Sequence, residues 1–243
     1  MESMTTFDYA AYGHSVPENI VQAHQAAWQR LAGPGSWWTG AQRVEMARLA
    51  REGRAQRNDP PWLRHGSPAS SDLLPARAAD AVRRIAADVH SIDAAWATEA
   101  AQELGDAAYV EICAVTVYVT AIDAFADALG VPLEPLPEPV AGEPDGVRPE
   151  GTAEAGAFVP MLDPFPGPNV ARALSLAPAD NRAFRALVGS MYAMADWRAY
   201  DSRLPQAANS TYFQDLVWEN RPLTRPQVEL VAARVSSVNE CFY

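Results

Sequence analysis

Residues 106–132 read DAAYVEICAVTVYVTAIDAFADALGVP, and this stretch decides the fold class. Its middle, residues 115–120, is a run of β-branched and aromatic residues that local propensity favours as a strand. Alanine-rich turns flank that run, and Gly130 followed by Pro132 is a helix stop signal. The length and these boundaries favour one long buried helix that ends near Leu129.

The sequence on both sides of this stretch has a helical pattern. Alanine is frequent, glycine is sparse outside turns, and apolar residues recur at helical spacing. Before it, the pattern predicts helices over residues 19–31, 39–54, 75–89 and 92–104. After it, Pro178 opens one helix, and Thr224 with Gln227 makes a capping box for another. That last helix carries an apolar stripe, expected to be its core face, made of Val228, Val231, Ala232, Val235 and Val238. The sequence therefore predicts an all-α protein.

An acidic, proline-rich segment interrupts the helical pattern. Residues 131–168 hold seven acidic residues, Arg148 as their single cation, and 10 of the 20 prolines. Such a segment sustains neither a helix nor an inner strand. The expected division is a helical domain over residues 1–131, a linker over 132–168 and a second, incomplete helical domain over 169–243. A short repeat, residues 39–42 against 224–227, suggests that the halves are related, or that both are ordinary capped helices.

Composition excludes several classes of function. The net charge is −11, which argues against a nucleic-acid surface, and all 19 basic residues are arginine, which excludes lysine Schiff-base chemistry. The apolar run between Glu111 and Asp123 is too short for a bilayer, and no apolar leader opens the chain. We expect a cytoplasmic protein that binds neither nucleic acid nor membrane, with both cysteines reduced.

Histidine and cysteine are the remaining candidates for chemistry. The four histidines show no metal-ligand spacing and are each expected on the surface or in a loop: His14, His24, His65 and His90. No metal or cofactor is therefore expected. Cys113 lies in an apolar run, where a thiol has a raised pKa, and we assign it no role. Cys241 instead follows the capped helix of residues 224–238.

Residues 223–243, LTRPQVELVAARVSSVNECFY, resemble the signature of the AhpD-like alkylhydroperoxidase and carboxymuconolactone decarboxylase (CMD) superfamily. In its redox branch, a capped helix leads to a Cys-x-x-Cys pair, with a Glu twelve residues before the first Cys and a His four residues after the second. Cys241 matches the first Cys and Glu229 the Glu. Residues 106–113 and 123–134 are also similar to the helical domain of this family, although Gln56 or Arg57 occupies the first-Cys position in that half.

The resemblance departs from the family pattern after Tyr243, where the second Cys would stand. We expect either a shortened reading of the gene or a UGA codon that encodes selenocysteine, which would complete a Cys-x-x-Sec pair. A helix N-terminus favours the reactive thiolate. The resemblance then implies that the downstream chalcogen attacks peroxide, that Cys241 resolves the oxidised intermediate, and that Glu229 acts as a base through the family's His.

The implied function is a peroxidase-type thiol or selenol oxidoreductase of antioxidant defence, impaired in this form. Its substrate would be a hydroperoxide, its reductant a dithiol or a thioredoxin- or lipoyl-type protein, and its assembly a homo-oligomer. Two alternatives remain: a non-redox CMD-like helical enzyme, and an oligomeric structural or binding module.

Overall fold

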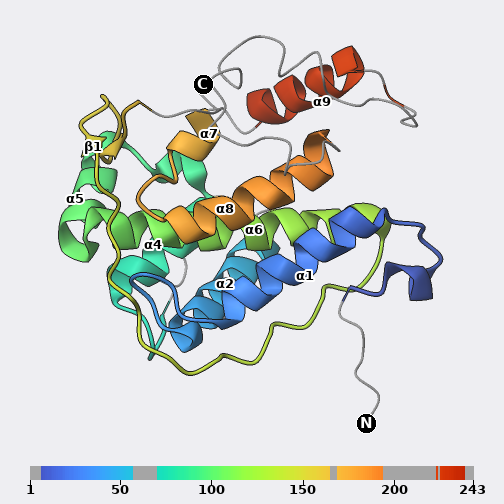
Figure 1. Cartoon of the computed structure of the whole chain (residues 1–243), viewed down its shortest axis with the longest axis horizontal. Helices are drawn as coiled ribbons and strands as arrows, with labels where there is room; N and C mark the ends of the chain where they lie inside the picture. Colours follow the sequence, from blue (N-terminus) through green and yellow to red (C-terminus); the bar gives the residue numbers. More distant parts are fainter. Residues whose placement is uncertain (1–6, 57–69, 165–168, 194–222, 224, 239–243) are drawn as a thin grey trace.

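The computed structural model describes residues 7–56, 70–164, 169–193, 223 and 225–238. They are mostly helical (Figure 1), so the all-α expectation is confirmed at this level. The α-helices are α1 Glu18–Ala32, α2 Gly40–Ala55, α4 Ala76–Ala87, α5 Ala94–Leu104, α6 Asp106–Leu129, α7 Asn169–Arg172, α8 Pro178–Val188 and α9 Arg225–Val238. Short 3-10 helices η1 Tyr9–Tyr12 and η2 Val89–Ser91, a π-helical turn η3 Gly189–Ala193, and one antiparallel pair of two-residue strands, β1 Thr152–Ala153 and β2 Met161–Leu162, complete the described elements.

Helix α6 is the central helix, and it settles the ambiguity of its β-branched run in favour of the predicted helix. Helices α1, α2, α4, α5 and α8 all contact it. The Thr120 hydroxyl donates back to the Thr116 carbonyl at 2.9 Å, which satisfies a polar group inside an apolar helix. The helix ends at Gly130, whose φ of 69° is the left-handed conformation that a glycine cap supplies.

The length of α6 corrects one expectation from the sequence. Within Asp106–Leu129, one 18-residue window has a mean hydropathy of 1.7, so this helix is long and apolar enough to cross a membrane by length and composition. Half of that window is buried inside the structure, as in the core helix of a globular protein. The shorter run between Glu111 and Asp123 underestimated the apolar stretch, because Ala-rich turns extend it at both ends.

The predicted helices before α6 are confirmed, with boundaries that shift by a few residues. Helix α2 starts with the predicted capping box, in which the Gln42 amide donates to the Thr39 hydroxyl at 3.3 Å and the Thr39 amide donates to the Gln42 side chain at 3.0 Å. The corresponding Thr224 lies outside the described residues, and α9 begins at Arg225.

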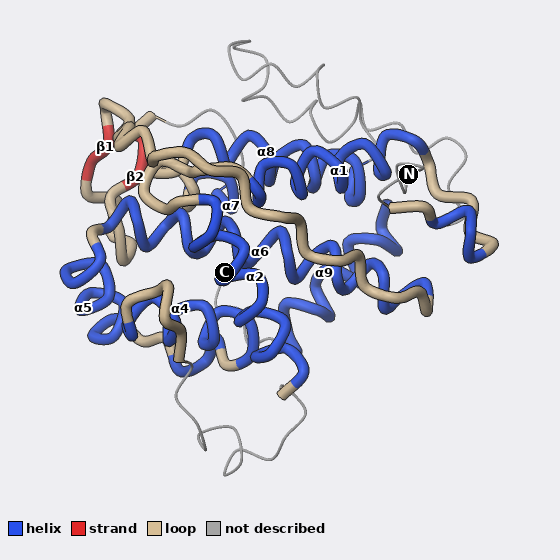
Figure 2. Tube along the Cα trace, turned by 90° about the horizontal axis from the view of Figure 1, so that it is seen from below, coloured by secondary structure: helices blue, strands red, loops and turns tan. Residues whose placement is uncertain are grey.

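The segment from Val131 to Glu150, here called the strap, has no helix and lies along the surface of the helices (Figure 2). It is bonded to the rest of the protein along its length. The Trp28 indole donates to the Pro135 carbonyl at 2.8 Å, and the amides of Val140 and Gly146 donate to the carbonyls of Ala32 and Ser36, both at 2.8 Å. The sequence correctly excludes helix from the strap, but its many prolines do not make it a detached linker.

The hydrophobic core is continuous across the expected domain boundary. Leu174, Leu176 and Leu187 belong to the same buried cluster as the apolar side of α6, and α8 contacts both α1 and α6. The described part of the expected second domain before residue 194 therefore packs on the first domain. Residues 194–222, which make up much of the rest, lie outside the described residues.

Candidate functional site

The two site residues expected from the sequence are not brought together by the described structure. Glu229 lies on α9 and is half-buried. Cys241 lies outside the described residues, so no distance between the two follows.

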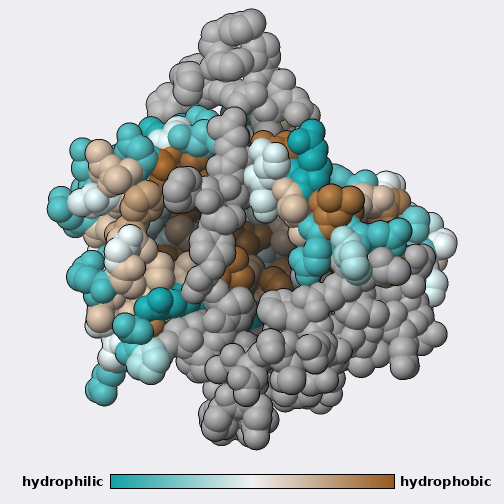
Figure 3. Space-filling view, turned by 90° about the horizontal axis from the view of Figure 1, so that it is seen from above, coloured by the Kyte–Doolittle hydropathy of each residue, from teal (hydrophilic) through white to brown (hydrophobic). Residues whose placement is uncertain are grey.

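The expected core face of α9 is split in the structure: Val228 and Ala232 are half-buried, but its three other members are exposed. Val231, Val235 and Val238 are more than half exposed, and Leu230 is 71% exposed. The half-buried side of the helix carries Val228, Glu229, Ala232 and Ser236 instead. Seen from above the view of Figure 1, the molecule exposes apolar surface at several places among its described residues (Figure 3). The spacing identified an apolar stripe correctly but could not tell which way the stripe faces.

A buried cluster of charges, which sequence reasoning missed, lies at the centre of the described fold. It joins four helices through Arg30 of α1, Arg43 of α2, Glu111 and Tyr118 of α6, and Asp180 of α8; we call it the Arg43 cluster. The side chains of Arg43 and Glu111 are fully buried, and that of Asp180 is 2% exposed. Buried charges persist where they are paired and hydrogen-bonded, as these are.

Arg43 connects the members of this cluster. It donates to a carboxylate oxygen of Glu111, to Asp180 Oδ1 at 2.7 Å and to the Tyr118 hydroxyl at 2.7 Å. Its Nε is buried with no hydrogen-bond partner among the described residues. Arg30 approaches Asp180 from the other side, donating from Nε at 3.1 Å and from Nη2 at 2.9 Å.

The pKa values of the two carboxylates in the Arg43 cluster are shifted in opposite directions. Burial alone would raise the pKa of Asp180, but Arg43 and Arg30 outweigh burial and hold this pKa below its ordinary value. Burial raises the pKa of Glu111, and Arg43 does not fully offset it because the charge of Asp180 acts in the same direction as burial. The backbone amides of Ser36 and Trp37 donate to Glu111 Oε2 at 3.0 and 2.9 Å.

The Arg43 cluster is built to hold helices together, since its central groups are closed to solvent. A Cβ on Gly35 would lie 1.6 Å from Glu111 Oε1, so only glycine fits beside this carboxylate. A substrate cannot reach Arg43 or Glu111 in this structure, because both side chains are fully buried. The cluster therefore holds α8 against α1, α2 and α6.

A second polar centre surrounds His24, and here the expectation of a surface histidine is wrong. His24 is 0% exposed, because it occupies a position on the apolar side of α1 together with Ile20, Ala27, Trp28 and Leu31. Its Nδ1 lies 2.7 Å from the Tyr9 hydroxyl and its Nε2 lies 3.3 Å from Met191 Sδ. Burial lowers the pKa of His24 to about 4, so the ring is neutral near pH 7.

The His24 centre borders an open groove of about 390 Å³ between η1 and α1. Tyr9 lines this groove, along with Phe7, His14, Val16, Glu18 and Val21. The rings of Phe7 and Phe125 meet His24 edge-on, with centroids 5.4 and 5.1 Å away.

No group of three or more His, Cys, Asp or Glu side chains that could hold a metal ion occurs in the described part of the chain. His14 is half-buried, His90 is exposed, and His65 lies outside the described residues. Burial raises the pKa of the Cys113 thiol to about 12, and this thiol contacts Tyr109. A raised pKa leaves little of the reactive thiolate at Cys113, as the apolar run around it predicts.

The sequence did contain a signal for both buried centres. Arg43 and His24 stand at apolar-stripe positions, Arg43 with Met46, Ala47 and Ala50, and His24 with Trp28 and Leu31. A polar residue at a core position of an amphipathic helix requires a buried partner. Spacing could not identify the partners Asp180 and Met191, because they come from distant segments.

Comparison with known protein families, with curated proteins and with solved structures finds no match to this chain.

Proposed function

We propose that this protein is a peroxidase-type thiol or selenol oxidoreductase related to the AhpD-like and CMD superfamily. The observation that carries the proposal is α9, Arg225–Val238, a regular helix with Glu229 half-buried on its inner side and with Cys241 three residues beyond its end. The motif resemblance gives the residue at the Glu229 position the role of a general base that acts through the family's His, and the half-buried setting of Glu229 supports this role.

We also propose a division of the chain into two related units. It comprises two related helical units of the AhpD and CMD type, with α2 and α9 as their equivalent helices, and the strap followed by residues 151–168 between them. Only the second unit carries Cys241. The similar lengths of the two helices, 16 and 14 residues, support this pairing.

The proposed reaction needs no bound cofactor. The chalcogen after Tyr243 attacks the terminal oxygen of a hydroperoxide, so that the O–O bond breaks, an alcohol leaves and a sulfenic or selenenic acid forms. Cys241 then attacks that group and releases water as the disulfide or selenenylsulfide closes. Glu229 accepts a proton during this cycle. A cytoplasmic dithiol, or a thioredoxin- or lipoyl-type protein, returns the pair to its reduced form.

Hydroperoxide turnover with a dithiol reductant tests the proposal. The 243-residue chain is expected to be nearly inactive, and a version extended after Tyr243 by a cysteine, with a histidine four residues later, is expected to turn over. A matched extension with serine in place of that cysteine is the control. In the active version, Cys241→Ser and Glu229→Gln should each lower turnover, whereas Cys113→Ser should not. Turnover by the serine extension would overturn the proposal.

The second candidate function, assembly into a homo-oligomer, is favoured by the outward apolar side of α9. Leu230, Val231, Val235 and Val238 present 54–71% of their surface to solvent. Apolar helix faces of this kind are covered in assemblies. Light scattering of the chain and of Val231→Glu with Val235→Glu tests this: an oligomer that the two substitutions dissociate supports assembly through α9, and a monomeric parent chain contradicts it.

A further inference from the structure

The contact between His24 and Met191 fixes the state of the histidine ring. A thioether sulfur can only accept a hydrogen bond, so His24 Nε2, at 3.3 Å from Met191 Sδ, carries the proton. The neutral ring then has an unprotonated Nδ1, which accepts from the Tyr9 hydroxyl at 2.7 Å. Tyr9 thus donates to His24, and His24 donates to the sulfur of Met191.

The surroundings of Met191 distinguish it from the other described methionines. Met191 is half-buried on the π-helical turn η3, at the end of α8. Met46 is fully buried in the core, and Met161 is half-buried on β2. In the described part of the chain, Met191 is the one methionine that is both partly open to solvent and given a hydrogen bond by a histidine. Single-turn π-helices often occur at functional sites.

We propose that Met191 is a modification site at which hydroperoxides oxidise the sulfur to a sulfoxide, with His24 as the residue that holds the transferred oxygen. A sulfur lone pair attacks the terminal oxygen of the hydroperoxide, forming the S–O bond and breaking the O–O bond. Sulfur loses two electrons and the peroxide gains them. The hydroperoxide's own proton passes to the departing alkoxide, which leaves as an alcohol. As the S–O bond forms, the hydrogen bond from His24 Nε2–H passes from the sulfur to the transferred oxygen.

Oxidation at this place changes the packing of η3 on α1. At the present 3.3 Å between His24 Nε2 and Met191 Sδ, a hydrogen bond of about 2.9 Å to the sulfoxide oxygen would be sharply bent at that oxygen, so a well-aligned bond requires a wider separation. His24 cannot retreat, because Phe7 and Phe125 flank its ring. The end of α8 must therefore move away from α1, where the two now contact.

Oxygen uptake by individual methionines tests the proposal on the full chain. After treatment with tert-butyl hydroperoxide, peptide mass spectrometry at successive times should show Met191 oxidised about tenfold faster than Met161, the factor expected of one hydrogen bond to the oxygen that accepts charge. Met46 should be the slowest. Equal rates at Met191 and Met161, or a slower rate at Met191, would overturn the proposal.

Variants separate the role of His24 from simple exposure. His24→Gln is expected to bring the ratio of the Met191 and Met161 rates close to one, and a ratio unchanged by this substitution would overturn the proposal. If His24→Gln does not fold, Tyr9→Phe, which removes the donor to Nδ1, should also lower the ratio. The nitrogen chemical shifts of the His24 ring should change on oxidation of the unaltered chain and stay constant in Met191→Leu.

The proposal is independent of the thiol chemistry above. Cys241→Ser should leave oxidation of Met191 unchanged, so failure of one proposal does not decide the other. Loss of Met191 oxidation in Cys241→Ser would overturn the direct attack by sulfur described here.

Discussion

Arg43 on α2 and Asp180 on α8 are 137 residues apart in the sequence, yet Arg43 Nη2 donates to Asp180 Oδ1 at 2.7 Å in the buried centre of the protein. Neither side chain is more than 2% exposed. Because Arg43 also pairs with Glu111 of α6, this one guanidinium links three helices. The pairing is the specific contact that places the segment after the strap on the helices before it.

Removing one partner of this pair should destabilise the whole fold. Asp180→Ala leaves Arg43 buried with less negative charge around it, and breaking a buried pair costs about 4 kcal/mol. Asp127→Ala is the matched control, since Asp127 is 59% exposed although its partner Arg54 is half-buried, and it should cost about 0.5 kcal/mol. Urea unfolding measures both. Equal losses of unfolding free energy would show that the Arg43 cluster does not hold α8.

The close approach at Gly35 makes a second prediction about the same cluster. Gly35→Ala forces Glu111 away from Arg43, because the new Cβ would lie 1.6 Å from Glu111 Oε1, and we expect a loss of about 3 kcal/mol in unfolding free energy. Gly33→Ala is the control, since its nearest atom would be 3.9 Å away. Thermal unfolding should show a clearly lower midpoint for Gly35→Ala alone; an unchanged midpoint would contradict the geometry.

The pH dependence of stability should carry the signature of His24. Its pKa in the folded protein is about 4 and its ordinary value is 6.5, so the unfolded chain binds the proton more readily. The contribution of His24 to the free energy of unfolding is fully present above pH 6.5. It decreases as the pH falls toward 4, by about 3 kcal/mol in total.

Denaturant unfolding between pH 7 and pH 4 measures this loss. His24→Gln should flatten the dependence over that range, whereas His90→Gln, which changes an exposed histidine, should keep it. A dependence of the same steepness in His24→Gln would assign the effect to other groups.

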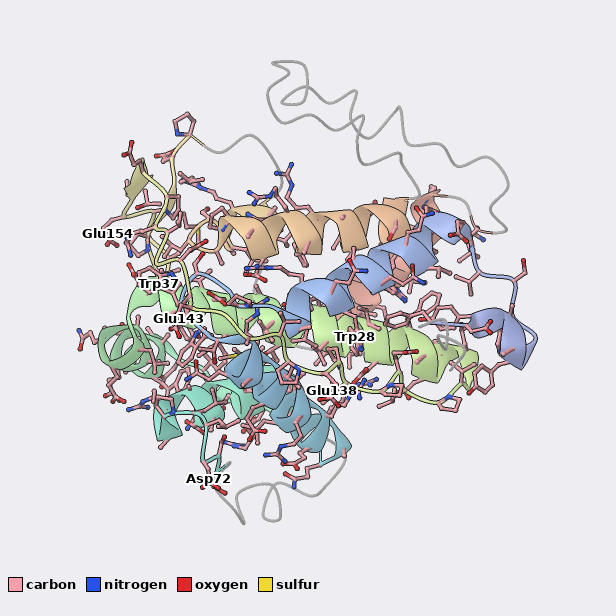
Figure 4. All side chains as sticks on the ribbon, turned by 60° about the horizontal axis from the view of Figure 1, so that its bottom comes forward. Trp28, Trp37, Asp72, Glu138, Glu143 and Glu154 are labelled. Carbon is pink, nitrogen blue, oxygen red and sulfur yellow. The ribbon has the colours of Figure 1, made fainter. Side chains whose placement is uncertain are left out.

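The strap should behave as part of the folded protein. Figure 4 shows Trp28, which holds its start, and Glu138 and Glu143 along it. The amides of Val140 and Gly146, which donate to Ala32 and Ser36, should exchange their hydrogens slowly. Ala141 is an exposed residue whose amide donates to no backbone carbonyl of the described residues, and this amide should exchange fast. Uniformly fast exchange along the strap would mean that it detaches.

The sequence predicted the elements better than their partners. The helix over Asp106–Leu129 followed from the glycine stop and the alanine-rich turns, and the start of α2 from Thr39 and Gln42, because these signals act within a few residues. The strap is held through backbone groups such as the Pro135 carbonyl. Every residue type has such a carbonyl, so the sequence does not reveal which one is bonded. The outward side of α9 could not be predicted either, since periodicity gives a stripe and not its direction.

The candidate sites divide in the same way. Arg43 and His24 could have been flagged as polar residues at core positions, but Asp180 and Met191, their partners, lie 137 and 167 residues away. The raised pKa of the Cys113 thiol is confirmed, because neighbours along one helix decide its environment. Local context therefore predicted the chemistry of single residues, and only the tertiary structure assembled them into centres.

The two cysteines should differ in reactivity toward iodoacetamide. With a pKa raised to about 12, almost none of the Cys113 thiol is ionised at pH 7.5, so its alkylation in the folded chain should be very slow. A thiol poised for peroxide chemistry at Cys241 should instead be alkylated within minutes. Mass spectrometry of the native chain should find one fast modification, absent in Cys241→Ser and kept in Cys113→Ser. Alkylation of Cys241 no faster than that of a cysteine in the urea-unfolded chain would remove the support that thiol activation gives to the proposed function.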